Sequence, residues 1–143
     1  MNNVERDTLY ARREAIVNAH IQAEAVDHDV KAALATFTRP QYDVPALGGV
    51  VDGAAGVDGL LHAVLSAYPD FWLRETARYH AENSVIVECV FGGTQRGEWA
   101  GIAPTGKSME VAAALFFLFE VEGLVCERVY FDHGTVLRQL GVG

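Results

Sequence analysis

Three side chains with complementary chemistry alternate near the end of the chain. Arg128, Tyr130 and Asp132 share one face of an expected strand, because successive side chains point to opposite faces. Inside an apolar pocket Asp132 would lose water, which raises the pKa of a carboxylate and suits it to general acid or base catalysis. The alternative is that Asp132 lies at a wet rim and caps a closing helix that begins near residues 133–135. The opposite face of the strand takes Val125, Glu127, Val129 and Phe131.

The central element that must position this strand is the stretch 84–111. Apolar and β-branched residues flank a glycine-rich segment with one proline, which predicts a strand, a broad reversal and a second strand that continues to Phe119. Both faces of residues 111–119 are largely apolar, so we expect this strand to be covered on both sides. A hairpin at residues 122–123 then leads into the last strand, 124–132.

A further strand is expected over residues 71–82. Its two alternating sets differ in polarity, and Glu75 interrupts the more apolar one, so the face that points inward is left open. The first set is Trp72, Arg74, Thr76, Arg78 and His80, and the second is Phe71, Leu73, Glu75, Ala77 and Tyr79.

The N-terminal half is predicted to be mainly helical. Residues 3–27 carry a recurring apolar stripe, and Asp27 is expected to cap a second helix that ends before Pro40. Residues 41–49 form a short extended piece that Pro45 limits to an edge, residues 50–59 form a loop, and Asp58 opens a third helix. The stripe of the first helix is Val4, Leu9, Ile16, Ala19, Ile21, Ala23 and Val26, and its polar side is Glu5, Arg6, Arg12, Arg13, Glu14 and Glu24.

Length and composition indicate one domain, residues 1–143, with a substantial core. Half of the residues are hydrophobic and the formal net charge is -8 without a Lys/Arg cluster, which argues against nucleic-acid binding. No stretch has the roughly 18 apolar residues of a membrane span, and the polar N-terminus lacks a secretion signal, so we expect a cytoplasmic protein without a membrane partner. Cys89 and Cys126 are expected to be buried free thiols, and a disulfide is the alternative.

Two other kinds of site are not expected. His28, His62, His80 and His133 are scattered, without carboxylates at ligand spacing, so no metal site is predicted. The glycines of residues 92–97, GGTQRG, lack the spacing and context of a phosphate-binding loop, and a hairpin explains them.

Two motifs carry a family resemblance. Residues 93–107, GTQRGEWAGIAPTGK, and residues 127–141, ERVYFDHGTVLRQLG, are similar to segments of the SnoaL-like polyketide cyclases, within the nuclear-transport-factor-2-like superfamily. The resemblance implies an α+β fold, with a curved antiparallel sheet in the form of a half-open cone or α+β barrel packed against about three N-terminal helices. A pocket would lie between helices and sheet, and a homodimer would form through the convex face.

The same resemblance implies a function. The family's cyclases close a ring by intramolecular aldol condensation of a polyketide ester, without metal or organic cofactor, so a small hydrophobic or polyketide-like ligand is expected. Asp132 matches their acid/base aspartate, and Tyr130 and His80 are candidates for polar support. We expect Arg128, Trp72, Phe117 and Phe119 to line the pocket, and Trp99 to pack as a lid or a dimer contact.

One feature departs from an efficient cyclase. Residues 111–119 contain no His, Asn or Gln, so this strand offers the pocket no such polar partner. Related lyase or isomerase activities are therefore equally open, and the rival class is a small-ligand-binding or dimeric scaffold protein without catalysis, since fold does not fix function.

Overall fold

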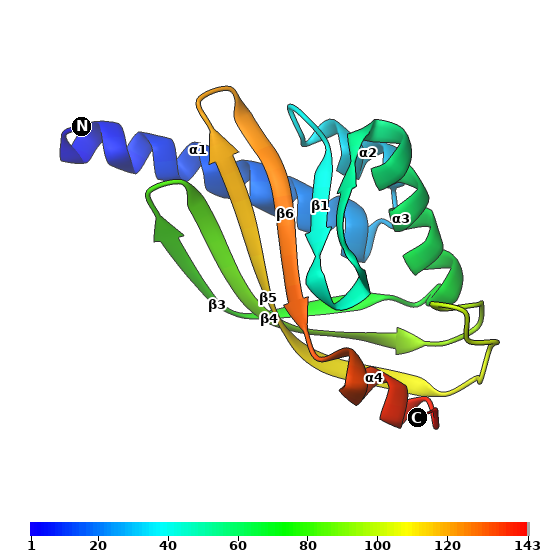
Figure 1. The fold of residues 1–143 in the computed structure, drawn as a ribbon. Helices are drawn as coiled ribbons and strands as arrows, with labels where there is room; N and C mark the ends of the chain where they lie inside the picture. The colour runs from blue at the N-terminus through cyan, green and yellow to red at the C-terminus, as the bar shows by residue number, and fades with distance from the viewer. Residues whose placement is uncertain (143) are drawn as a thin grey trace.

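The computed structural model describes residues 1–142 and contains one curved six-stranded sheet in the order β2-β1-β6-β5-β4-β3. The long helix α1 crosses the concave side, where α2 and α3 also lie, while α4 follows the last strand (Figure 1). The strands are β1 (Gln41–Val44), β2 (Gly49–Asp52), β3 (Trp72–Ala81), β4 (Ser84–Thr94), β5 (Ser108–Glu120) and β6 (Gly123–Phe131). The helices are α1 (Asn3–Ile21), α2 (Val30–Ala35), α3 (Gly53–Ala67) and α4 (His133–Gln139). The expected α+β cone is confirmed.

The first helix begins and ends with recognisable signals. Asn2 and Glu5 form a capping box, in which each side chain accepts a hydrogen bond from the other's backbone N–H. The helix then widens into a π-helical turn, Gln22–Val26. Asp29, not Asp27, caps α2, because its side chain accepts from the backbone N–H of Ala32.

The buried stripe of α1 differs from the expected one. The residues that face the sheet are Arg13, Val17, His20, Ala23 and Ala25, whereas Val4 and Val26 are exposed. The Arg13 guanidinium donates a hydrogen bond to the backbone carbonyl of Glu82 and packs over the ring of Phe119. These contacts compensate for the burial of its charge. Long polar side chains with internal partners thus occupy positions that the apolar pattern assigned to solvent.

The segment between α2 and α3 is a small β-ribbon rather than a strand followed by a loop. A 3-10 turn, Pro45–Leu47, connects β1 to β2, and α3 begins at Gly53, five residues before Asp58. Strand β1 is not an edge, because β2 pairs with one side of it and β6 pairs with the other in parallel. Pro45 lies directly after β1, where it removes no ladder hydrogen bond.

Strands β3 to β6 form consecutive antiparallel hairpins, as expected. The pairing of β3 with β4 shifts between Glu75 and Ala77. Such a bulge moves the following side chains to the other face. It therefore places Leu73 near the start of the strand and His80 near its end on the same, helix-facing side, which the strict alternation did not predict.

Strand β5 is buried on one face only within a single chain. Met109, Val111, Leu115, Phe117 and Phe119 are buried, whereas Ala112, Ala114 and Phe116 on the other face remain partly or fully exposed. The prediction that this strand is covered on both sides therefore does not hold for the single chain.

The core lies between the concave face of the sheet and the helices. Its fully buried members include Val17, Val57, Leu61, Val85, Val87, Phe117, Leu124 and Leu140. Cys89 and Cys126 are buried and free. None of the helices within residues 1–142 is long and apolar enough to cross a membrane.

Candidate functional site

A small apolar cavity lies between the concave face of the sheet and the helices. It has a volume of about 80 Å³ and is lined by side chains from the end of α1 and the π-helical turn, from α3 and α4, and from β1 and β3 to β6. An engineered cavity of roughly 150 Å³ takes benzene, so a molecule larger than a few heavy atoms enters only if lining side chains move. The aromatic side chains in its wall are Tyr42, Tyr68, Phe71, Phe91, Trp99, Phe117 and Phe131.

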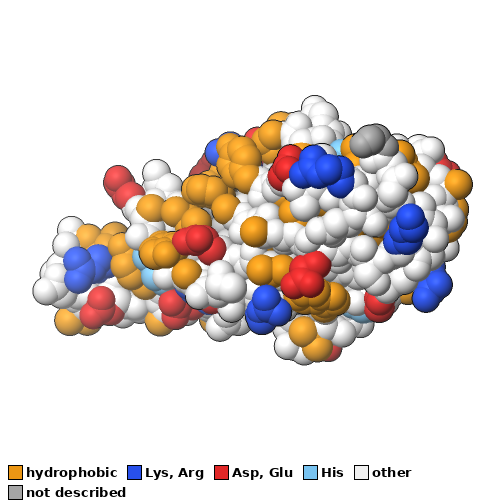
Figure 2. All heavy atoms as spheres, turned by 90° about the horizontal axis from the view of Figure 1, so that it is seen from below, with side chains coloured by type: hydrophobic (Ala, Val, Ile, Leu, Met, Phe, Trp, Pro, Cys, Tyr) orange, Lys and Arg blue, Asp and Glu red, His pale blue; other side chains and the backbone are white. Residues whose placement is uncertain are grey.

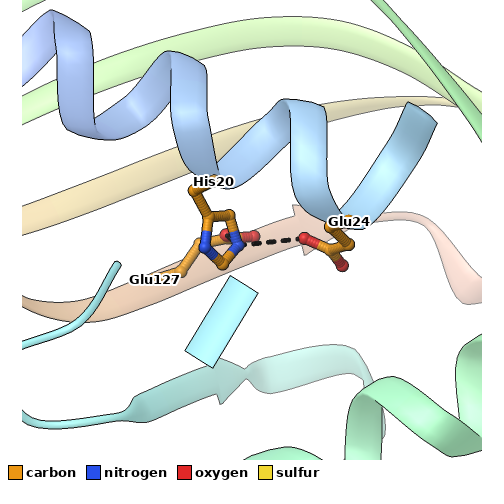
Figure 3. A group of neighbouring side chains, drawn as sticks. All are labelled: His20, Glu24 and Glu127. Atoms are coloured by element: carbon orange, nitrogen blue, oxygen red, sulfur yellow. Dashed lines mark hydrogen bonds and ion pairs between the residues drawn. The ribbon is translucent and has the colours of Figure 1, made fainter. Parts of the chain in front are cut away.

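One end of this cavity carries a cluster of polar side chains, His20, Glu24, Tyr42 and Glu127, which we call the polar cluster. The His20 imidazole projects from α1 toward the sheet, the Glu24 side chain projects from the π-helical turn, and the Glu127 side chain projects from β6 (Figure 3). His20 Nε2 lies 2.8 Å from the Tyr42 hydroxyl, 3.0 Å from Glu24 Oε2 and 2.9 Å from Glu127 Oε1. Three oxygen atoms therefore surround one ring nitrogen.

Local structure explains how these side chains meet. His20 and Glu24 are four residues apart, the spacing at which helical side chains face each other, and the π-helical turn is a feature found often at functional sites. Glu127 shares the cavity face of β6 with Val129 and Phe131. Tyr42 lies beside it, because β1 pairs with β6 at the Tyr42–Glu127 position.

The hydrogen-bond directions identify the protonation state of His20. The Thr36 hydroxyl donates its proton to the carbonyl of Ala33 at 2.6 Å, so it accepts from His20 Nδ1 at 2.8 Å. The Tyr42 hydroxyl donates to Glu24 Oε2 at 3.0 Å, so it accepts from Nε2. Both ring nitrogens therefore carry protons, and the ring is an imidazolium.

Electrostatics agree with this assignment. Burial by itself lowers the pKa of His20, but the close contacts with the carboxylates of Glu127 and Glu24 outweigh it and raise the pKa to about 10. Burial, followed by the charge of Glu24, raises the pKa of Glu127 above its ordinary value, and His20 opposes this shift. Burial together with the two carboxylates also raises the pKa of Tyr42, which keeps its proton at neutral pH.

Glu127 is buried beside the imidazolium. Its side chain is 3% exposed, and Oε1 lies 2.9 Å from His20 Nε2. This approach is an ion-pair contact rather than an aligned hydrogen bond, because the Nε2 proton is directed to Glu24 and Tyr42 and Oε1 has no hydrogen-bond partner within residues 1–142. A buried carboxylate with a raised pKa in the cavity wall can take up a proton from a bound molecule.

The same donors could hold a metal ion. His20, Glu24 and Glu127 each offer one ligand atom, and these atoms lie within 4.8 Å of one another. A histidine ligates through a neutral ring nitrogen, so a metal would have to displace the Nε2 proton that Glu24 and Tyr42 now accept. The three side chains are of the types that bind a divalent cation. The hydrogen bonds observed at His20 Nε2, however, favour a proton on this nitrogen over a metal ion.

The other end of the cavity is closed by the glycine-rich loop between β4 and β5. Gln95 is fully buried and organises the loop, since its amide donates to the carbonyls of Gly97, Ile102 and Ala103 while its oxygen accepts from Thr105. Trp99 thereby lines the cavity, and its ring lies edge-on to that of Tyr68 at 5.5 Å. Between the two expected roles for Trp99, the single chain supports that of a lid.

A close approach explains why this loop needs Gly97. The backbone N–H groups of Arg96 and Gly97 both donate to the carbonyl of Ala67 at the end of α3. A Cβ atom at Gly97 would lie 2.4 Å from the carbonyl oxygen of Ser66, which no side chain permits. The motif residues therefore fasten the loop to α3 and fix the wall of the cavity.

Asp132 lies away from this cavity, at the far end of β6. Its side chain is 68% exposed and accepts from the Thr135 hydroxyl at 2.6 Å, with Arg138 at 3.6 Å. The hydrogen bond from Thr135 holds the pKa of Asp132 below its ordinary value. The residue stands directly before α4, at the rim position weighed as the alternative from the sequence, but its side chain makes no capping hydrogen bond to the helix backbone.

Tyr130 and Arg128 share the outer face of β6 with Asp132. Tyr130 is 46% exposed and packs edge-on against Phe116, while Arg128 Nε donates to Asp43 Oδ2 at 2.9 Å. The period-two grouping of these residues is confirmed. Of the opposite set, Glu127, Val129 and Phe131 line the cavity. Val125 does not, because the pairing with β5 shifts between Leu118 and Phe119 and Leu124 is the buried residue there.

The other expected site residues are distributed over several regions. Of the four residues expected to line the pocket, only Phe117 does so. Phe119 packs under Arg13, and Trp72 lies beside Arg74 at the outer end of β3. His80 stacks on Tyr10 and pairs with Glu14 at 2.8 Å, so it is tied to α1 outside the cavity.

Sequence reasoning missed most of the polar cluster. His20 was not singled out, Glu24 was assigned to the polar side of the first helix, and Glu127 was placed on the face opposite Asp132 without a functional role. Two signals were present: a His and a Glu at the i, i+4 spacing beside an apolar stripe, and an acidic residue among Val125, Val129 and Phe131. Either one marks a buried charge that needs a partner.

A comparison with protein families identifies the chain's relatives. The model of the SnoaL-like polyketide cyclase family matches residues 16–140. This range includes His20, Glu24, Tyr42 and Glu127 as well as the glycine-rich loop. No curated protein sequence matches the chain.

Solved structures show the same fold at low sequence identity. A protein from Jannaschia sp. CCS1, provisionally described as a SnoaL-like polyketide cyclase, is 14% identical with a TM-score of 0.82, over 93% of this chain and 94% of that one. A ketosteroid isomerase-like protein from Catenulispora acidiphila DSM 44928, solved with trimethylamine, is 22% identical with a TM-score of 0.75, over 90% and 93%. TsrD from Streptomyces laurentii is 22% identical with a TM-score of 0.77, over 91% and 95%.

Proposed function

Because the chain belongs to the SnoaL-like polyketide cyclase family, we propose that it is an enzyme that moves a proton on a small apolar carbonyl compound bound in the cavity. The reaction that fits best is the family's intramolecular aldol condensation. The observation that carries the proposal is the Glu127 carboxylate, which is buried, is raised in pKa and forms part of the wall of an apolar cavity.

In this reaction Glu127 acts first as base and then as acid. Its carboxylate takes a proton from the carbon next to a carbonyl, and the C–H electrons move to the carbonyl oxygen as an enolate. The enolate carbon then bonds to a second carbonyl carbon of the same molecule. The resulting alkoxide takes a proton back from Glu127, so no oxidant, reductant or cofactor is required.

The rest of the polar cluster supports this proton transfer. The imidazolium of His20 lies 2.9 Å from Glu127 Oε1 and stabilises the ionised carboxylate in a dry site, where charges interact strongly. Glu24, Tyr42 and Thr36 hold the ring in place through hydrogen bonds of 2.8 to 3.0 Å. A positioned general base contributes roughly 10² to 10⁴ in rate.

The proposal is tested without knowledge of the natural substrate. A small ketone, cyclopentanone, is incubated with the protein in D₂O, and uptake of deuterium next to the carbonyl is followed by NMR. We expect the protein to accelerate exchange and Glu127→Gln to lose about 100-fold of this rate, because the amide keeps the shape of the side chain but accepts no proton. Binding of the ketone without accelerated exchange would favour a ligand-binding protein instead.

The same assay decides between Glu127 and Asp132. The family resemblance assigns the acid/base role to Asp132, and this assignment remains a prediction. Asp132→Asn removes that carboxylate while keeping its size. Loss of exchange in Asp132→Asn but not in Glu127→Gln would assign the base to Asp132, through a conformation in which the strand end reaches the ligand.

We also propose that the protein is a homodimer that pairs through the outer face of the sheet. Hydrophobic side chains form patches between single charges on the side of the molecule seen from below (Figure 2). A shallow, mainly apolar hollow on the outer face is lined by Tyr79, Ile86, Ala112, Ala114, Phe116 and Tyr130, together with the acidic residues Glu88 and Asp132. Exposed apolar surface of this kind marks an interface. Sedimentation velocity should show a dimer that Phe116→Glu converts to monomer, whereas Val4→Glu, at an exposed position of α1, should leave it intact.

A further inference from the structure

The cavity wall contains a buried polar atom outside the polar cluster that has no hydrogen-bond partner, the hydroxyl oxygen of Tyr68. Within residues 1–142, three buried side-chain atoms lack a hydrogen-bond partner: Tyr68 Oη, His80 Nδ1 and Glu127 Oε1. Tyr68 and Glu127 line the same cavity, whereas His80 does not. Glu127 Oε1 still has an ion-pair contact with His20 at 2.9 Å, so Tyr68 Oη is the unpaired atom of the cavity wall. A folded protein rarely leaves such a buried polar atom unpaired, which points to a bound molecule that pairs with it.

We propose that Tyr68 forms a hydrogen-bond donor subsite that binds the carbonyl oxygen of the ligand while Glu127 faces the adjacent C–H group. This inference rests on the proposed function and names its substrate class: a compact, neutral carbonyl compound with an apolar body and at least one hydrogen on the neighbouring carbon. The Tyr68 hydroxyl is a donor where the ligand offers only an acceptor.

The position of Tyr68 is fixed by its surroundings. It ends α3, where its backbone N–H donates to the carbonyl of Val64, and its side chain is 1% exposed. Its ring meets Trp99 edge-on at 5.5 Å, and Gly93 passes so close that a Cβ there would lie 3.0 Å from Tyr68 Cβ. A donor held this firmly needs no rearrangement when charge develops on the ligand oxygen.

The hydroxyl also keeps its proton under working conditions. Burial raises the pKa of Tyr68 to about 12, so the phenol is neutral at physiological pH. It can therefore donate to a carbonyl, and more strongly to the enolate formed when Glu127 removes the neighbouring proton. A negatively charged acceptor makes a stronger hydrogen bond than a neutral one.

His80 also carries a buried atom without a partner, but its surroundings differ from those of Tyr68. His80 Nε2 pairs with Glu14 on α1, and the ring stacks on Tyr10. His80 does not line the cavity. Of these two residues, it is Tyr68 that combines a place in the apolar cavity wall with the free donor that a carbonyl ligand requires.

The test compares two probes of nearly equal shape, cyclopentanone and methylenecyclopentane, which differ by a C=O and a C=CH₂ group. Affinities are measured by NMR titration for the wild type, Tyr68→Phe and Tyr10→Phe. We expect the wild type to prefer the ketone by about tenfold, the value of one good hydrogen bond. Tyr68→Phe should lose this preference, and Tyr10→Phe, a change on α1 where the ring stacks on His80 outside the cavity, should keep it.

Equal binding of the two probes by the wild type, binding of neither, or a preference that survives in Tyr68→Phe would overturn the proposal. If Tyr68→Phe does not fold, the ¹³C resonance of the labelled carbonyl in the wild-type complex provides the readout. A hydrogen bond moves it downfield, and an unmoved resonance would overturn the proposal equally.

Failure of this inference can be separated from failure of the proposed function. Accelerated deuterium exchange that is lost in Glu127→Gln, together with an unchanged rate and ketone preference in Tyr68→Phe, retains the function and removes the subsite. A ketone preference that depends on Tyr68, without accelerated exchange, retains the subsite and removes the catalytic role.

Discussion

Glu127 and Asp132 lie on and directly after the same strand, five residues apart, yet they occupy opposite environments. Glu127 faces the helices, is 3% exposed and lies against an imidazolium. Asp132 lies at the rim on the outer side, is 68% exposed and bonds to the first turn of the following helix. Two carboxylates of one strand region can therefore differ in proton affinity, because helices bury one of them and solvent surrounds the other.

The two environments move the carboxyl pKa values apart. Burial raises the pKa of Glu127, whereas the Thr135 hydrogen bond lowers that of Asp132. A carboxylate with a raised pKa is the better proton acceptor near neutral pH, and one with a lowered pKa is the better helix cap. Substitutions in the polar cluster and at the rim, together with changes of pH, test this difference between the two carboxyl groups.

The largest effect on stability is expected from removal of the His20 imidazolium, whose positive charge lies between the Glu24 and Glu127 carboxylates. His20→Gln leaves two carboxylates close together without a cation, and breaking a buried ion pair costs about 3–5 kcal/mol of unfolding free energy. Urea denaturation measures this loss. The matched control, His62→Gln, changes an exposed histidine that pairs with Asp58 and should stay within about 0.5 kcal/mol. A loss below 1 kcal/mol in His20→Gln would contradict an imidazolium in the cluster.

The second effect is a dependence of stability on pH. Since folding raises the pKa of His20 from 6.5 to about 10, the folded state binds the extra proton more tightly. The stabilisation is fully present below pH 6.5 and is lost as pH rises through 10. Urea midpoints of the wild type should therefore fall between pH 7 and 10, and those of His20→Gln should fall less. Parallel curves for the two proteins would refute the shift.

The third effect separates the two carboxylates as bases. Exchange by a general base rises with pH as the carboxylate ionises. If Glu127 is the base, the midpoint of the deuterium-exchange rate lies above 4.5, and if Asp132 is the base, it lies below 3.8. The profile of the wild-type rate between pH 3 and 8 distinguishes them without any mutation.

The smallest effect is expected at the rim. Asp132→Asn should change the unfolding free energy by no more than about 0.5 kcal/mol, because the side chain is exposed and the amide oxygen of asparagine can still accept from the Thr135 hydroxyl. Thermal and urea unfolding measure this directly. A loss above 2 kcal/mol would mean that Asp132 has a structural partner beyond Thr135 and Arg138.

The strand pattern allowed much of the fold to be predicted. Period two placed Glu127, Val129 and Phe131 on one face of β6 and Arg128 and Tyr130 on the other, as observed. The glycine-rich loop and its flanking strands were also predicted correctly, because glycine, proline and alternating apolar residues act locally.

The helical half was less predictable, for a physical reason. Arg13, His20 and Glu24 look solvent-facing from their type, but each finds a partner that is distant in sequence: the Glu82 carbonyl, the Glu127 carboxylate and the Tyr42 hydroxyl. A propensity or a polarity pattern contains no information about such partners. The bulge in β3 likewise arises from pairing with β4 rather than from its own residues.

The sequence by itself determined the family, the order of elements and the two faces of the last strand, since these follow from motifs and local periodicity. Only the tertiary structure decided which face of that strand is covered by α1 and which looks outward. The packing of α1 on one face sets the dielectric around each carboxylate. It buries Glu127 in the dry cavity and leaves Asp132 in water. The pKa of an acidic residue depends on this long-range packing, so the candidate catalytic group emerged from the fold rather than from the motif.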